Sequence, residues 1–297
     1  MTSPGQLRRA YIAWVAVCLI WGTTYLAIKI TIRTMPPILM GGLRYMTAGL
    51  ILAAVLRAWG RALPDRSIWP RQFLLSFFMI GLGNGGVVTG SQWLPSGLTA
   101  VLIATNPFWM VSIEAIVSGG KQLHRRDWLG LLTGFAGIVV LAWPAIHLGG
   151  KSGQNFLLGV IAVQIACAGW AIGSAYTRRH VMPGDVLGVA ALQMFFGGVL
   201  MTIAGTALGD WHRLSFTTQS AVAFVYLIIV GAVIAYAAYS YALRHLDVAV
   251  VSLYTYINPI IAVILGAVFL GEPVGWRMFV ATALIAAGVL IVRPKQG

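Results

Sequence analysis

Charged residues are scarce in this chain of 297 residues, of which only 9% are Asp, Glu, Lys or Arg and 59% are apolar. This composition lies far outside the range of soluble globular domains. Cysteine is almost absent as well. The two cysteines, Cys18 and Cys167, fall in the middle of apolar runs, where a free thiol packs as a small apolar group, so nothing requires a disulfide.

The sequence also lacks the usual marks of catalysis. A membrane hydrolase or prenyltransferase would be expected to show grouped carboxylates, or His and Cys ligands at helical spacing. Here the five histidines and seven acidic residues are scattered, and no GxxxxGK phosphate loop occurs. We therefore expect no metal site, no cofactor, no ATP hydrolysis and no enzymatic activity.

Long apolar runs are what the sequence has in place of charge. A helix needs about 17 to 25 mostly apolar residues to cross a hydrocarbon core of roughly 30 Å. Ten such runs lie between Pro, Gly and Arg residues, and Pro144 cuts the fifth one short. They cover residues 10–30, 36–56, 72–93, 98–118, 127–143, 155–177, 186–208, 218–243, 248–270 and 276–292. We predict an all-α integral membrane protein with ten transmembrane helices.

The net charge of +13 would suggest a nucleic-acid partner in a soluble chain, but the positions of the basic residues explain it differently. Fourteen of the 20 Lys and Arg fall on the side shared by the N-terminus and alternate loops, five fall on the opposite side, and Arg44 lies within a span. Cytoplasmic loops carry such an excess. We expect both termini in the cytoplasm and no nucleic-acid partner.

The sequence repeats once, at a shift of 149 positions in the front part of each copy and 152 in the back part. The matched pairs include Cys18 with Cys167, Trp21 with Trp170, Asn106 with Asn258, and Pro107 with Pro259. The predicted copies, residues 1–147 and 148–297, each hold five apolar runs. Because five is odd, the second copy enters the membrane upside down, an arrangement common in secondary transporters. The Gly-rich segment 144–155 is expected to be a short outside loop between them.

Two prolines, Pro107 and Pro259, lie within predicted spans, and each follows an asparagine. A proline removes the hydrogen bond to the carbonyl four residues back, which predicts a kink, and lipid cannot satisfy the freed group. One interpretation makes these prolines hinges, with Asn106 and Asn258 offering amide groups to a substrate. The other is ordinary membrane-helix architecture, and both remain open.

Aromatic and polar residues gather at mid-depth on several spans. Trp21 and Trp170 lie too deep for the interfacial belt where membrane tryptophans concentrate, which suits a cavity for amphipathic small molecules. Packing between helices explains a midplane Trp equally well. The cavity candidates are Trp21, Thr24, Tyr25, Asn84, Gln92, Asn106, Trp109, Trp170, Ser174, Tyr239, Tyr254 and Asn258.

Charges within the spans are costly and are functional candidates by default. Arg44 and Glu114 are such residues, with Lys29 near the end of its span. The predicted depths of Arg44 and Glu114 differ by roughly 10 Å, at about 1.5 Å per residue, which is too far for a simple ion pair. Arg44 is expected to bind free helix carbonyls or an anionic group, and Glu114 to reach the cytoplasmic surface.

Six short motifs follow one another along nearly the whole chain. They are Trp21-Gly22-Thr23-Thr24-Tyr25, Pro36-Pro37 before Arg44, Gly83-Asn84-Gly85, Pro95-Ser96-Gly97, Tyr256-Ile257-Asn258-Pro259 and Gly271-Glu272-Pro273. In these motifs the chain resembles the EamA exporters of the drug/metabolite transporter superfamily. The resemblance implies two inverted five-helix repeats in the bacterial inner membrane. It also implies a central cavity between the first, third, fourth, sixth, eighth and ninth spans. One departure is that Gly120 stands in the first copy where the second has Glu272.

The resemblance and the residues together predict a secondary transporter that exports small neutral or zwitterionic solutes, above all amino acids or related metabolites. It would work by alternating access, coupled or as a passive facilitator. The small four-helix multidrug relatives depend on a carboxylate in their first helix, which this chain lacks. The alternatives are a proton-coupled multidrug exporter and a membrane enzyme acting on lipid-linked substrates. The expected partners are a small-molecule substrate and the lipid bilayer, with the chain acting as a monomer.

Overall fold

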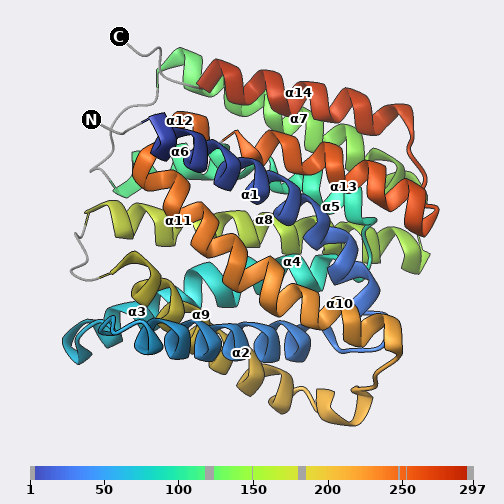
Figure 1. Cartoon of the computed structure of the whole chain (residues 1–297). Helices are drawn as coiled ribbons and strands as arrows, with labels where there is room; N and C mark the ends of the chain where they lie inside the picture. The colour runs from blue at the N-terminus through green and yellow to red at the C-terminus, as the bar shows by residue number, and fades with distance from the viewer. Residues whose placement is uncertain are drawn as a thin grey trace.

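The structure is a computed structural model that describes residues 4–117, 124–148, 150–179, 185–246, 248–251 and 253–292. These residues form helices joined by short turns, and the described ranges contain no strand. The helices lie side by side in a bundle (Figure 1). Their bounds are α1 Pro4–Thr31, α2 Pro37–Ala58, η1 Arg66–Ile68, α3 Trp69–Ser76, η2 Phe77–Asn84, α4 Gly85–Gly90, α5 Ser96–Ile103, α6 Asn106–Val117, α7 Arg125–Leu148, α8 Gly150–Arg179, α9 Val186–Ala207, η3 Asp210–Arg213, α10 Thr218–Ile228, η4 Ile229–Ile234, α11 Ala235–His245, α12 Val248–Val251, α13 Tyr254–Leu270 and α14 Trp276–Val292.

The described helices have the length and composition of membrane spans. Eight continuous helical stretches within the described residues are long and apolar enough to cross a bilayer, and two shorter apolar helices, Tyr254–Leu270 and Trp276–Ile291, follow. The predicted all-α membrane fold is confirmed. The start of α1 and the end of α14 lie at the same end of the bundle, here named the terminal end; the opposite end is the far end (Figure 1).

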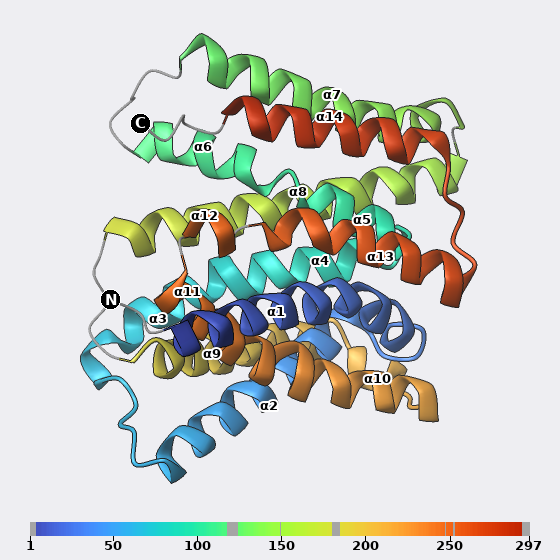
Figure 2. The same ribbon diagram turned by 45° about the horizontal axis from the view of Figure 1, so that its top comes forward.

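The helix packing has the same form in both predicted copies. The second and seventh spans, α2 and α9, pack against each other, as do the fifth and tenth spans, α7 and α14 (Figure 2). The first span, α1, packs against α11 and α13, and its counterpart α8 packs against η2, α4 and α6. The first helix of each predicted copy therefore packs against the third and fourth spans of the other copy. The predicted boundary at residue 147 falls near the end of α7 and stays a prediction.

The third and eighth spans each contain a π-helical segment at matching positions, η2 in the first copy and η4 in the second. A π segment widens the helix and leaves backbone groups that the α-helical pattern would have paired, and such segments occur often at functional sites. Here they lie between α3 and α4 and between α10 and α11. Both π segments contribute residues to the cavity described below.

The prediction that Pro144 ends the helix of the fifth apolar run was wrong. Pro144 does not end the fifth span: α7 continues to Leu148 and α8 begins at Gly150, so the predicted outside loop is almost entirely helical. A proline within a helix removes a single backbone hydrogen bond, which the rest of a long helix can tolerate. At the predicted kink of the fourth span, the helix is interrupted at Ala104 and Thr105, and Pro107 lies in the first turn of α6.

Candidate functional site

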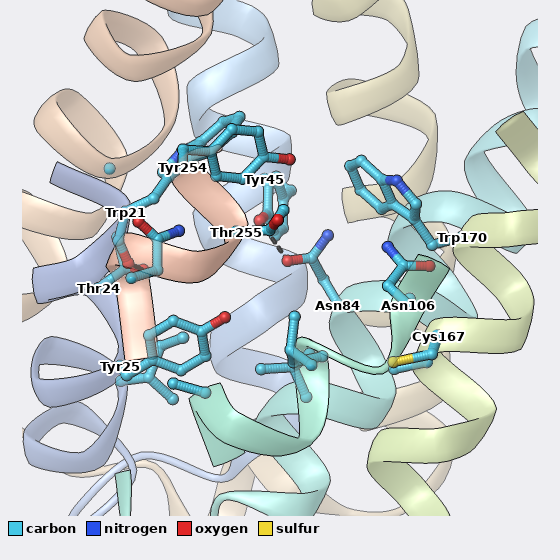
Figure 3. Close-up of a pocket in the computed structure, with 18 of the residues that line it drawn as sticks. Trp21, Thr24, Tyr25, Tyr45, Asn84, Asn106, Cys167, Trp170, Tyr254 and Thr255 are labelled. Carbon is cyan, nitrogen blue, oxygen red and sulfur yellow. Dashed lines mark hydrogen bonds between the residues drawn. The ribbon is translucent and has the colours of Figure 1, made fainter. Parts of the chain in front are cut away.

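A cavity of about 150 Å³ lies within the bundle, at mid-height on the spans (Figure 3). Internal cavities of roughly this volume can hold a molecule the size of benzene. The first, second, third, fourth, sixth, eighth and ninth spans contribute to its wall. The lining residues are Trp21, Thr24, Tyr25, Ile28, Arg44, Tyr45, Gly83, Asn84, Val87, Ala100, Ile103, Asn106, Ala166, Cys167, Trp170, Gly231, Tyr236, Tyr254, Thr255 and Asn258.

An aromatic cluster forms one wall of the cavity. The ring of Trp21 lies 5.8 Å from Tyr236, 5.2 Å from Tyr239 and 4.9 Å from Tyr254, measured between ring centroids. The Tyr236 and Tyr254 contacts are edge-on, the geometry that aromatic rings favour. Since these residues come from α1, α11 and α13, the cluster fixes three helices from both copies around Trp21. Trp170 of α8 stands in a separate part of the cavity (Figure 3).

A hydrogen bond between α2 and the third span holds the amide of Asn84. The Tyr45 hydroxyl donates to Asn84 Oδ1 at 2.6 Å, drawn as a dashed line in Figure 3. Asn84 Nδ2 donates to the carbonyl of Met79 at 3.3 Å, a group five residues back in the π segment. Asn84 is therefore oriented by its neighbours, and its position follows from the π segment.

Arg44 is the charged residue in the cavity wall. Arg44 is only 3% exposed, and its Nε donates a hydrogen bond to the carbonyl of Leu227 at 3.2 Å. Leu227 lies in α10, two residues before η4 begins. The guanidinium carbon also lies 4.7 Å from the centroid of the Tyr45 ring. Binding of Arg44 to a helix carbonyl agrees with one of the two expectations for this residue.

The two Asn-Pro motifs differ in their surroundings. Asn258 is 5% exposed on α13, and when its amide nitrogen is oriented to donate it reaches the carbonyls of Cys18 and Tyr254, each at 3.0 Å. Asn106 follows the break in the fourth span, and its buried Oδ1 has no hydrogen-bond partner among the described residues. Pro259 lies inside α13, whereas Pro107 begins α6. The second copy thus holds its asparagine in place, and the first leaves its equivalent open to the cavity.

Four of the predicted cavity residues lie elsewhere. Gln92 is exposed in the turn after α4, where its Nε2 donates to the carbonyl of Thr89. Trp109 Nε1 donates to Gln164 Oε1 at 2.9 Å, between α6 and α8. Ser174 is half-buried one turn beyond Trp170, and Tyr239 stands behind Trp21 in the aromatic cluster. The other eight candidates line the cavity, and their role in binding stays a prediction.

Twelve of the 20 lining residues were absent from the predicted cavity set. The polar or charged ones among them are Arg44, Tyr45, Tyr236 and Thr255, of which Arg44 was predicted separately as a charge within a span. Tyr45 immediately follows Arg44, so its ring could have been placed beside the charge from the sequence alone. Thr255 adjoins Tyr254, which was predicted. The resemblance gave no reason to include the second span, and that span enters the wall through Arg44 and Tyr45.

Polar contacts tie the spans together at the far end of the bundle. Lys29 Nζ, near the end of α1, donates to the carbonyls of Ser91 at 2.6 Å and Leu94 at 2.8 Å. The carboxylate of Glu272 accepts from Ser96 N at 2.8 Å and from Ser96 Oγ at 2.7 Å, at the first turn of α5. A carboxylate at a helix N-terminus is stabilised by the free N–H groups and the helix dipole. Gly120, the counterpart of Glu272, lies outside the described residues.

Ion pairs connect the spans at the terminal end. Arg179 Nη2 of α8 lies 2.8 Å from Glu114 Oε1 of α6, and both side chains are partly exposed. Asp185, before α9, pairs with Arg61 at 2.7 Å and with Arg244 at 3.0 Å. Glu114 therefore pairs with Arg179 at the terminal end, away from Arg44 and outside the cavity wall, and the expectation that it reaches the cytoplasmic surface stays a prediction.

Comparison with known proteins agrees with this architecture. The chain is 32% identical over 288 residues to the uncharacterized inner membrane transporter YedA of Escherichia coli K12, covering 97% of this chain and 91% of YedA. It is 25% identical to a chloroplastic WAT1-related protein of Arabidopsis thaliana over 93% of this chain and 67% of that protein. A solved crystal structure of 22% identity shares the fold with a TM-score of 0.64, over 95% of this chain and 96% of the other.

A family profile, that of the EamA-like transporter family, matches residues 8–143 and 157–293, one match in each half of the chain. The matches cover most of the ten spans and agree with the motifs that carried the resemblance. Both the profile and the relatives are named as membrane transporters rather than enzymes. The chain belongs to the EamA-like transporter family.

Proposed function

We propose that this transporter exports small neutral or zwitterionic solutes, such as amino acids or related metabolites, across the bacterial inner membrane through the cavity around Trp21. The observation that carries the proposal is the chemistry of the wall. Aromatic rings, amides and hydroxyls dominate it, and none of its described residues is acidic. Such a surface suits a solute with an apolar part and a few polar groups.

The absence of an acidic lining residue favours this proposal over proton-coupled multidrug export. A cavity that exchanges lipophilic cations for protons needs an anion that can be neutralised by either. Glu114, the carboxylate within the spans, is paired with Arg179 and does not line the cavity. Transport of a neutral solute needs no such group, and the chain can act as a passive facilitator.

We infer that the structure represents a state closed at the far end. There α5 packs against both α1 and α13, and Lys29 and Glu272 add polar contacts between these helices. Beyond the break in the fourth span, α6 packs chiefly against α8. With the termini in the cytoplasm, as the distribution of Lys and Arg favours, access from the terminal end would be access from the cytoplasm. Alternating access would then involve the break at Ala104 and Thr105.

The test is solute efflux from proteoliposomes with a panel of amino acids, dyes and quaternary cations, with and without an imposed pH gradient. Trp21→Ala and Trp170→Ala should lower amino-acid efflux at unchanged protein yield. Trp128→Ala is the matched control, because Trp128 is 56% exposed on α7. Unchanged efflux in both cavity variants, or transport of the cations alone and only with the pH gradient, would overturn the proposal.

A further inference from the structure

The cavity carries a positive charge, that of Arg44, to which no carboxylate of the described residues is paired. Arg44 is 3% exposed and contributes to the wall, while none of the described lining residues is acidic. Arginine keeps its charge in proteins. Removing an ion from water costs several kcal/mol unless a counterion or well-placed hydrogen bonds replace the hydration. A buried guanidinium beside a cavity, with no paired carboxylate among the described residues, therefore favours a negatively charged occupant.

The carboxylates of the described residues all lie elsewhere. Glu114 and Asp185 pair with arginines at the terminal end, and Glu272 lies at the first turn of α5. Asp210 pairs with Arg213, and the oxygens of Asp65 and Asp127 bind nearby backbone N–H groups. Among the described residues none lies within ion-pair distance of Arg44.

Most of the guanidinium's hydrogen-bonding capacity is unused. Of its five N–H donors, the Nε group donates to Leu227, and the described residues provide no other hydrogen bond to it. Nη2 lies next to Gly231 of η4, where an added Cβ would come within 3.3 Å of it. Because Gly231 also lines the cavity, the absence of a side chain there keeps room beside the guanidinium. The planar fork is thus free to bind two oxygens of one anionic group.

We propose that Arg44 binds the carboxylate of the transported solute, so that among the neutral and zwitterionic solutes the substrates are those with a carboxylate, amino acids above all. This deepens the proposed function and rests on it. The aromatic wall of Trp21, Tyr236 and Tyr254 receives the apolar part of the solute. In an amino acid, the ammonium can donate to Asn106 Oδ1, the buried acceptor without a partner.

A purely structural role for Arg44 makes a different prediction. If Arg44 only ties α2 to α10, its loss lowers stability and affects all solutes equally. If it binds the solute carboxylate, its loss removes the preference for an acid over the matching amide. Gln193 provides the control: it is the counterpart of Arg44 in the second copy, its Nε2 donates to Gln72 Oε1 at 2.9 Å between α9 and α3, and it does not line the cavity.

The experiment uses the purified full chain in detergent, with tryptophan fluorescence as the binding signal because Trp21 and Trp170 line the cavity. The probes are benzoate and L-phenylalanine, each compared with its primary amide. We expect the wild type to bind each acid at least about tenfold more tightly than its amide, since hydrogen bonds to charged groups are among the strongest. Arg44→Gln should abolish this preference, Arg44→Lys should keep part of it, and Gln193→Ala should leave it intact.

Equal binding of acid and amide to the wild type, or no binding of either acid, overturns the proposal. So does a full acid preference in Arg44→Gln. If Arg44→Gln does not fold, the test uses Gly231→Ala, which crowds the guanidinium, and Arg44→Lys, which replaces it. Each should lower the preference for the acid over its amide severalfold. Efflux from proteoliposomes separates the carboxylate subsite from the transport function. Equal efflux of solutes with and without a carboxylate would refute the subsite alone. Acid-selective binding without any efflux would refute the transport function alone.

Discussion

A close helix contact between the two copies, that of α2 with α9, can be tested by adding one methyl group. Gly49 of α2 is buried against α9, and an added Cβ would lie 2.5 Å from Phe195 N, 2.7 Å from the carbonyl oxygen of Ala191 and 2.9 Å from Phe195 Cα. All three atoms belong to the backbone, so no side-chain rotation can relieve the overlap. Contacts between carbon atoms are favourable only from about 3.5 Å. In Gly49→Ala, α2 and α9 must therefore separate by roughly 1 Å.

The expected cost follows from these distances. Overpacking of a well-packed site costs about 1–3 kcal/mol, and contact with rigid backbone puts Gly49→Ala at the upper end of that range. Replacing Gly by Ala within a helix returns about 1 kcal/mol. We expect a net loss of about 2 kcal/mol, because small residues are what permit close helix packing in membranes. This corresponds to a fall in Tm of roughly 4–8 °C.

The assay is thermal unfolding of the purified protein in detergent, followed by fluorescence-detected size exclusion. Gly85→Ala is the matched control, because its Cβ would meet Met201 Cε at 3.7 Å and Ile38 Cδ1 at 3.9 Å, ordinary van der Waals distances. We expect its Tm to be unchanged or slightly raised. The argument about α2 and α9 is refuted if the two variants unfold at the same temperature.

Three further predictions concern the cavity and the ends of the bundle. Trp21→Ala should lower the free energy of unfolding by about 1.5–4.5 kcal/mol, at about 0.5–1.5 kcal/mol for each of three lost aromatic pairs, and so lower both Tm and efflux. Trp128→Ala should lower neither in the same assays. Glu272→Gln should lower Tm by several degrees by weakening the charge-assisted contacts to Ser96, and a Tm equal to wild type would refute this role. Glu114→Gln should leave efflux at neutral pH within about twofold of wild type, since the residue lies outside the cavity wall and exposed ion pairs contribute little; abolished efflux would identify Glu114 as a proton carrier.

Composition and periodicity were sufficient to predict the membrane fold. Each of the ten apolar runs corresponds to a span in the structure, because runs of 17 or more apolar residues have few alternatives to a membrane helix. The repeat also pointed to residues of the cavity wall: Trp21 and Trp170, which are equivalent in the two copies, both line the cavity. Equivalent positions in two copies that pack together tend to gather around their common centre.

The details that the sequence could not give depend on tertiary contacts. Whether a proline starts a helix or lies within one depends on what satisfies the neighbouring carbonyls, which is why Pro107 lies in the first turn of α6 while Pro144 and Pro259 lie within α7 and α13. The π segments have no sequence signal of their own. Gln92 was misplaced because the third span ends at Gly90, three residues before the end of the apolar run.

The difference between the two asparagines predicts how the cavity changes sides. The Asn258 amide nitrogen donates to the carbonyl of Cys18 on α1 and so joins α13 to α1, whereas the described residues give the Asn106 amide no hydrogen bond to the equivalent helix α8. Asn258→Ala should therefore destabilise the state closed at the far end. With about 1 kcal/mol per lost hydrogen bond, access from that end should rise about fivefold or more. Asn106→Ala loses no such bond and should leave access to the cavity from the far end unchanged.

The measurement is the rate at which an impermeant reagent alkylates a cysteine introduced at the cavity residue Val87, in vesicles with the far end exposed. Equal rates in the two variants would show that the asparagines do not distinguish the two states.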